Sequence, residues 1–238
     1  MVAVTFNNSW PSDNYKHLNQ MKKLLFILMI SAASIQLKAE SNENIKGNGK
    51  ITEQERSISS FNEIAAAGSV DIIITQGQNE GVVVITDKNI QQYVITEIKD
   101  NTLKIHIKEN ANISPSKLKV KVNCKQLISI KAGGSGDIQT DGSLKSDALQ
   151  ISQGGSGDFK LDLDLSKLTI TKAGSGDFIL TGKTDSFTIN SAGSGDIRAA
   201  KMTVNNCKIS LVGSGDVWLA KGTKASLSNV GSGEVHYE

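Results

Sequence analysis

A four-residue motif, Gly-Ser-Gly followed by an acidic residue, recurs six times in the second half of the chain. The copies begin at about 20-residue intervals, at Gly134, Gly155, Gly174, Gly193, Gly213 and Gly231, and the last one ends in Glu234 instead of Asp. A partial copy, Gly68-Ser69-Val70-Asp71, stands earlier in the chain. Self-similarity at a fixed period of this length indicates a repeat architecture, so the repeat constrains the fold more than any single residue does.

The residues that flank each motif alternate between apolar and polar. Relative to the motif serine, the apolar positions lie seven and five residues before it and three and five residues after it. They hold Ile128, Leu149, Leu168, Phe187, Cys207 and Ala225; Ile130, Ile151, Ile170, Ile189, Ile209 and Leu227; Ile138, Phe159, Phe178, Ile197, Val217 and Val235; and Thr140, Leu161, Leu180, Ala199, Leu219 and Tyr237. A period of two is typical of strands. The glycines on both sides of the serine permit a tight corner between two strands.

One such repeat cannot bury its apolar face alone, whereas stacked repeats bury it and pair every backbone group with the coils above and below. We therefore predict an all-β, single-domain parallel β-helix with coils of about 20 residues, right-handed as crossover connections usually are. A propeller or a sandwich is the alternative. Propeller blades take about 40–50 residues, and sandwich strands do not repeat one corner in this way.

Four segments are expected along the chain. Residues 1–20 are predicted to be a disordered, over-extended start, because Met21 begins a basic, apolar and small-residue sequence typical of a signal peptide at 21–39. The alternative is a membrane anchor or a buried helix, but the apolar run is shorter than the about 20 residues that span a bilayer. Residues 45–130 are predicted to be irregular coils that cap one end, continuous with the regular repeat at 131–238. Their expected strands are Val70–Thr75, Val82–Thr86, Val94–Lys99, Leu103–Ile107 and Leu118–Val122.

Charge and cysteine content exclude several functions. The net charge is +2, and residues 1–39 contribute four lysines against one aspartate, so the remainder of the chain is close to neutral. It lacks the excess positive charge that is typical of nucleic-acid-binding proteins. No cofactor is expected. Cys124 and Cys207 are predicted to lie about four coils apart, too far for a disulfide, and are interpreted as small buried residues.

Stacked coils would place the motif aspartates in a ladder of Asp137, Asp158, Asp177, Asp196 and Asp216. The simpler interpretation is a row of solvated turn residues that accept backbone hydrogen bonds. The alternative is a cation site, by analogy with calcium-binding nonapeptide solenoids, although that motif repeats every nine residues.

A second candidate site lies four residues after the motif serine. There Trp218 follows Ile179 and Arg198 in successive repeats, and an exposed aromatic ring at this position would offer a surface for a sugar or a protein. Catalysis is not expected, because the same carboxylate recurs in every repeat and no triad or metal-ligand spacing surrounds His106 or His236.

The sequence resembles the family described as "putative auto-transporter adhesin, head GIN domain", exported proteins of Bacteroidetes-type bacteria. The resemblance rests on Phe61-Asn62-Glu63-Ile64, Leu118-Lys119-Val120-Lys121-Val122 and the run from Leu127 into the Gly-Ser-Gly-Asp copies. It implies an exported β-helix at the periplasm or cell surface that binds an envelope protein or glycan, or serves there as a structural module. The alternative is a carbohydrate-binding or glycan-active β-helix. No membrane span is expected after signal cleavage, and self-association through the uncapped last coil is a further expectation.

Overall fold

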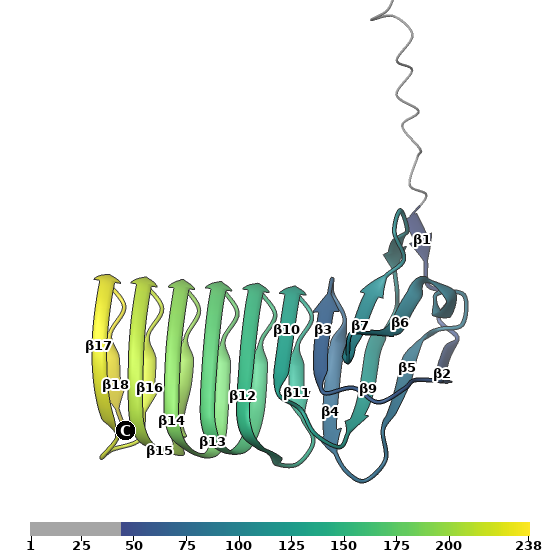
Figure 1. The fold of residues 1–238 in the computed structure, drawn as a ribbon. Helices are drawn as coiled ribbons and strands as arrows, with labels where there is room; N and C mark the ends of the chain where they lie inside the picture. Colours follow the sequence, from purple (N-terminus) through teal and green to yellow (C-terminus); the bar gives the residue numbers. More distant parts are fainter. Residues whose placement is uncertain (1–43) are drawn as a thin grey trace, which may run out of the picture. The chain divides into compact units, whose positions relative to one another are not determined.

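The computed structural model describes residues 44–238, which belong to one compact unit. The predicted start at 1–20 and the signal peptide at 21–39 lie outside the described residues. Within them the chain forms strands and one short 3-10 helix, η1 (Gln91–Tyr93). The strands of the repeat stand side by side as successive coils (Figure 1). The prediction of an all-β parallel β-helix is therefore confirmed.

The regular coils alternate long strands with the motif corner. The strands are β10 (Ser129–Gly134), β11 (Ile138–Thr140), β12 (Leu144–Gly155), β13 (Phe159–Gly174), β14 (Phe178–Gly193), β15 (Ile197–Gly213), β16 (Val217–Leu219), β17 (Lys224–Gly231) and β18 (Val235–Tyr237). All pairs among them are parallel, and the first motif glycines are in register from coil to coil. The pairing offset thus equals the spacing of the motifs in the sequence.

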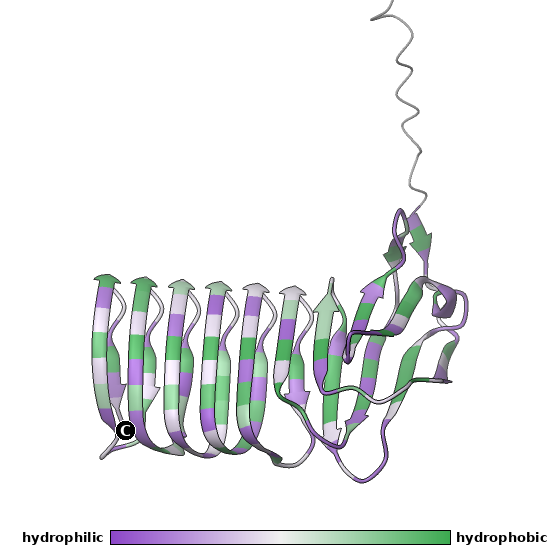
Figure 2. Ribbon diagram, viewed as in Figure 1, coloured by the Kyte–Doolittle hydropathy of each residue, from purple (hydrophilic) through white to green (hydrophobic). Residues whose placement is uncertain are grey.

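The predicted apolar columns fill the interior of the coils. Figure 2 shows the alternation of hydrophobic and hydrophilic residues along β12–β15, where the apolar members are buried. Phe159 and Phe178 stack in adjacent coils with ring centroids 4.6 Å apart and planes 9° from parallel. Ile128 is an exception near the cap, and the last described coil contains others. Ile128 is 38% exposed, and Leu127 is buried in its place because the connection from the cap enters the coil there.

The coil that precedes β10 and β11 in the stack comes from a distant part of the sequence. β3 (Glu63–Ala67) and β4 (Asp71–Gln76) pair in parallel with β10 and β11, 66 positions later in the chain. The partial motif at Gly68 consequently lies on the corner at Gly134, and the hydroxyls of Ser69 and Ser135 are 3.0 Å apart. This places the early copy in the same corner column as the regular repeats.

The intervening segment forms the cap, and it is not built from coils throughout. β7 (Thr102–Ile107) and β9 (Leu118–Cys124) continue the parallel stack beyond β3 and β4. Three strands pair antiparallel outside them: β2 (Ile51–Arg56), β5 (Gly81–Asp87) and β6 (Val94–Lys99). A small parallel pair joins β1 (Asn44–Lys46) to β8 (Asn112–Ser114). The prediction of irregular coils over 45–130 is therefore wrong for β2, β5 and β6, whose hairpin-like returns reverse the strand direction.

The described coil at the other end packs less tightly. β17 and β18 have a strand partner on one side only among the described residues. Leu227 is 50% exposed and Tyr237 is 47% exposed, although their columns are buried in the preceding coils. An apolar side chain in a β-helix thus needs a coil on both sides to be fully buried.

A fifth column, three residues before the motif serine, carries polar side chains in several coils. Lys172 in this column is 1% exposed, and its Nζ donates hydrogen bonds to the carbonyl oxygens of Gly195 at 2.6 Å and Gly174 at 3.3 Å. Gln153 and Asn229 donate from the same column to the carbonyls of Gly157 and Gly233. These side chains satisfy corner carbonyls that turn into the interior.

Burial lowers the pKa of Lys172, although Asp177 and Asp196 act to raise it. The unfolded chain therefore binds more protons between the folded-state pKa and the ordinary value of 10.5, so this residue favours folding more as pH rises across that window. We expect Lys172→Gln, which repeats the arrangement at Gln153, to be about 1 kcal/mol more stable than wild type at pH 7. The difference should shrink as pH approaches 10.5 in denaturant unfolding, whereas the exposed control Lys160→Gln should show no such trend. A pH-independent difference would contradict this account.

Candidate functional site

The motif aspartates form a hydrogen-bonded ladder between coils. One oxygen of each carboxylate accepts the backbone N–H of the corresponding acidic residue in the next coil. The N···O distances are 2.9 Å from Asp158 to Asp137, 2.8 Å from Asp177 to Asp158, 2.8 Å from Asp196 to Asp177, 3.1 Å from Asp216 to Asp196 and 2.8 Å from Glu234 to Asp216. The sequence predicted that these carboxylates accept hydrogen bonds from backbone N–H groups, and the structure shows that the N–H groups belong to the neighbouring coil.

The hydrogen bonds between coils indicate a structural role for the ladder. At the far end the second oxygens contact basic side chains, where the guanidinium of Arg198 lies 3.2 Å from Asp196 and the imidazole of His236 lies 3.6 Å from Asp216. Within residues 44–238 no three His, Cys, Asp or Glu side chains are grouped as metal ligands. Glu234 in the last described coil has a side chain that is 72% exposed.

The role of the ladder is tested by Asp177→Ala and Asp177→Asn. Alanine removes the acceptor of the Asp196 N–H, so we expect a loss of about 1–2 kcal/mol in unfolding free energy. Asparagine keeps an acceptor oxygen and removes one charge of the ladder, so its effect should stay within about 0.5 kcal/mol. Thermal unfolding with and without millimolar calcium completes the measurement. A calcium-dependent rise in Tm that Asp177→Asn abolishes would show that the ladder binds the cation.

The predicted residues Ile179, Arg198 and Trp218 lie in successive coils and line one small cavity. The cavity has a volume of about 270 Å³, and Leu180, Lys201 and Glu238 also line it. The indole of Trp218 is half-buried, with the Arg198 guanidinium 4.7 Å from its centroid on one face and the His236 ring 5.0 Å away on the other. Because both faces of the indole are covered by neighbouring coils, a ligand in this cavity would meet the edge of the ring.

A longer groove, which the sequence did not indicate, crosses the coils on another side. It has a volume of about 670 Å³ and is lined by Gln126, Lys145, Ser146, Asp147, Asp164, Leu165, Ser166, Lys183, Thr184, Asp185, Thr203 and Asn205. This set is called the polar groove below. Its volume falls within the range of about 300–1,000 Å³ that is usual for ligand sites.

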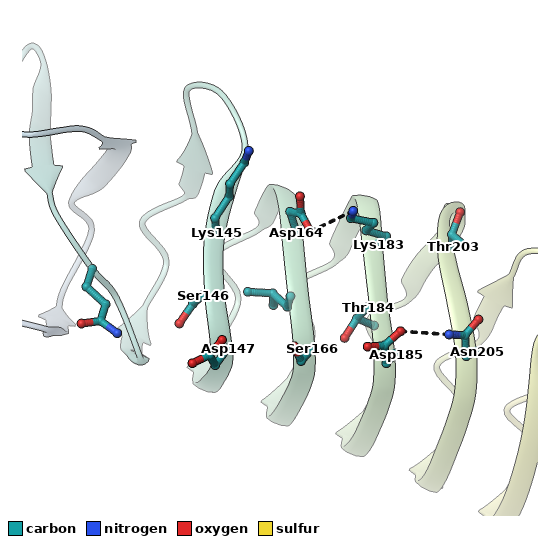
Figure 3. A pocket seen from close by; sticks show the side chains of 12 residues that line it. Lys145, Ser146, Asp147, Asp164, Ser166, Lys183, Thr184, Asp185, Thr203 and Asn205 are labelled. Atoms are coloured by element: carbon teal, nitrogen blue, oxygen red, sulfur yellow. Dashed lines mark hydrogen bonds and ion pairs between the residues drawn. The ribbon is translucent and has the colours of Figure 1, made fainter.

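Strand register arranges the polar groove in rows across four coils. Lys145, Asp164, Lys183 and Thr203 are paired residues of β12, β13, β14 and β15. A second row, two residues further along each strand, holds Asp147, Ser166, Asp185 and Asn205 (Figure 3). Two residues along a strand project from the same face, so both rows point into the groove. Its length across four coils is about 14 Å.

Some groups in the groove are already paired with each other. Lys183 Nζ lies 3.4 Å from Asp164 Oδ1, and Asn205 Nδ2 donates to Asp185 Oδ1 at 2.9 Å (Figure 3). Lys145 Nζ, the Asp147 carboxylate and the Ser166 hydroxyl have no partner among residues 44–238. At the same end, the side chain of Gln76 fixes the backbone of Lys145. Its Oε1 accepts a hydrogen bond from Lys145 N at 2.7 Å, and its Nε2 donates to the carbonyl oxygens of Lys125 and Lys145. The open charged groups therefore lie at the cap-proximal end.

The two cysteines of the described residues lie in the interior. Cys124 and Cys207 are both buried and both free. Burial raises the pKa of the Cys124 thiol to about 11, with a further contribution from Glu80, and that of Cys207 to about 12. Both thiols are therefore protonated near neutral pH and unreactive as nucleophiles.

No helix in residues 44–238 is long and apolar enough to cross a membrane.

The stacked coils with a filled interior define a β-solenoid. The family model described as "Putative auto-transporter adhesin, head GIN domain" matches residues 60–238, and the chain belongs to this family. Comparison with curated proteins finds none that matches.

Solved structures of similar proteins share the fold. A putative adhesin from Bacteroides fragilis NCTC 9343 has a TM-score of 0.72 at 25% identity, covering 82% of this chain and 100% of its own. A putative adhesin from Parabacteroides merdae ATCC 43184 has a TM-score of 0.67 at 25% identity, with 82% and 99% covered. A "putative lipid binding protein" from Parabacteroides distasonis ATCC 8503 has a TM-score of 0.67 at 25% identity, with 82% and 100% covered. The chain is thus an adhesin-like β-helix.

Proposed function

We propose that the protein is an exported, non-catalytic binding module of the cell envelope and that the polar groove is its binding surface. The observation that carries this proposal is the row of polar side chains in register across four coils. A groove built from one residue per coil presents a polar side chain at intervals of about 4.8 Å, which suits an extended polymer better than a compact metabolite. Family membership among adhesins supports the same conclusion.

The arrangement of the carboxylates supports binding over catalysis. A glycan-active enzyme needs two carboxyl groups that converge on one bond, one of them acting as an acid. In the groove Asp164 is held by Lys183 and Asp185 is held by Asn205, while Asp147 and Asp185 are exposed and lie two coils apart. No pair is enclosed with the water-excluded surroundings that tune such groups.

Sedimentation with cell envelopes of the source bacterium tests the proposal. We expect the purified full chain to pellet with the envelopes and Asp147→Ala to lose at least tenfold in affinity, because it removes an open acceptor. Glu53→Ala, which removes an exposed carboxylate from the cap strand β2, is the matched control and should bind like wild type. Equal binding by Asp147→Ala and wild type would exclude the groove as the binding surface. Release of reducing ends from envelope glycans, lost in Asp147→Ala, would show an enzyme instead.

The cavity at Trp218 is a second proposed surface, because it brings together all three residues that the sequence singled out. The relative named as a lipid-binding protein makes an apolar ligand worth testing there. Trp218→Ala in the same sedimentation assay, and with phospholipid vesicles, separates this surface from the groove. Binding equal to that of wild type to both would remove the cavity from consideration.

A further inference from the structure

The side chains that line the polar groove indicate the chemical class of its ligand. We propose that it binds a neutral, polyhydroxylated chain, a glycan strand laid across the coils; this inference rests on the proposed function of the same groove. Its open groups are a donor, Lys145 Nζ, an acceptor, the Asp147 carboxylate, and a hydroxyl that does both, Ser166 Oγ. A sugar hydroxyl donates and accepts, so neighbouring hydroxyls satisfy all three groups at once.

An extended peptide is disfavoured by the floor of the groove. Peptides that bind along a sheet add a strand to an open edge and place alternate side chains in apolar pockets. Along the groove the central floor strands β13 and β14 are paired on both sides, whereas Lys145 and Ser146 of β12 and Thr203 and Val204 of β15 have a strand partner on one side only among the described residues. Leu165 is the one large apolar residue in the lining. The two central strands of the floor therefore offer a peptide no open edge, and the lining offers it no row of apolar side-chain pockets.

Charge and polarity argue against polyanions and lipids. Three carboxylates, Asp147, Asp164 and Asp185, face two ammonium groups, Lys145 and Lys183, one of which is paired with Asp164. A nucleic acid or an acidic polysaccharide would bring further negative charge to this surface. An acyl chain would leave the polar groups unsatisfied. A neutral chain rich in hydroxyls remains as the class that the lining fits.

The length of the groove predicts a dependence on chain length. The open charged groups lie at the cap-proximal end of a groove that is about 14 Å long across four coils. The cavity beside Ser60, Asn62 and Asn101 shares Gln126 with the groove and extends the polar surface onto the cap. Longer oligosaccharides should therefore bind more tightly than disaccharides.

Chemical treatment of the envelopes before sedimentation tests the ligand class. Periodate cleaves vicinal diols and should abolish binding of the full chain, whereas proteinase K should leave binding unchanged. Binding that survives periodate but not proteinase K, and still depends on Asp147, would overturn the glycan inference while the proposed function stands. Failure of wild type to bind untreated envelopes would overturn both.

Purified probes then measure the interaction directly. Calorimetry uses tetrasaccharides and disaccharides of β-1,4-linked glucose and xylose, with polygalacturonate as the acidic comparison. We expect at least one neutral tetrasaccharide to bind, with Kd at least tenfold higher for its disaccharide and for Asp147→Ala. Glu53→Ala should match wild type, and unchanged Tm values should show that both variants are folded. Binding of polygalacturonate alone, or of no probe in the panel, would contradict the inference.

Discussion

Gly174→Ala should lower the free energy of unfolding by about 3 kcal/mol or more, a large fraction of the stability of a domain this size. Gly174 has φ +144°, a conformation that side chains rarely adopt, and a Cβ there would overlap the carbonyl group of Gly155 in the preceding coil. Neither problem can relax locally, because both backbones are fixed by coil pairing. The whole corner would have to open.

Gly154→Ala is the matched control for this substitution. Gly154 precedes the equivalent corner glycine of its coil, nothing lies within 4 Å of a Cβ at this position, and Ala173 and Ala192 already occupy it in the next coils. We expect a change within about 0.5 kcal/mol. Denaturant unfolding of the two variants checks the prediction. Similar losses for both would mean that any added methyl group near the corner is harmful and that the corner geometry is not the cause.

Phe178→Ala should cost about 3–5 kcal/mol. Phe178 is fully buried and stacks on Phe159, so truncation removes an aromatic contact and leaves a cavity between coils that the rigid backbone cannot close. Phe178→Leu should recover most of the loss, since Leu is of similar size and the column also holds Ile138 and Ile197. Thermal and denaturant unfolding give both values. A loss below about 1 kcal/mol for alanine would contradict a tightly packed interior.

The regular coils could be predicted from the sequence because the information is repeated in each of them. The columns of Ile130, Ile151 and Ile170 give the inward face, and the motif spacing gives the register. The cap could not be read in the same way. Antiparallel strands such as β5 show the same alternation as parallel ones, so the pattern predicts a strand without its direction. The loss of the Ile128 position has the same origin, at the junction of cap and coil.

The candidate sites could be predicted less completely than the regular coils. Ile179, Arg198 and Trp218 were found because they share one column, but the stacking that covers both faces of the indole depends on side-chain conformation. Lys172 was missed because a lysine in an alternating strand does not look like an interior residue. The polar groove was missed because Lys145, Asp164 and Lys183 differ in charge and form a row only after the coils are stacked. Alternating charge at one repeat position is the signal that would have indicated it.

The central claim is that the motif corner builds the coil and that ligands bind the face between corners. One binding isotherm, with the tetrasaccharide that wild type binds, tests it on two matched variants. Asp177→Asn changes a corner carboxylate and Asp147→Asn changes a groove carboxylate, each with the same loss of one charge. We predict an unchanged Kd for Asp177→Asn and a Kd at least tenfold higher for Asp147→Asn. The reverse order would place the binding site on the corner ladder and contradict this account.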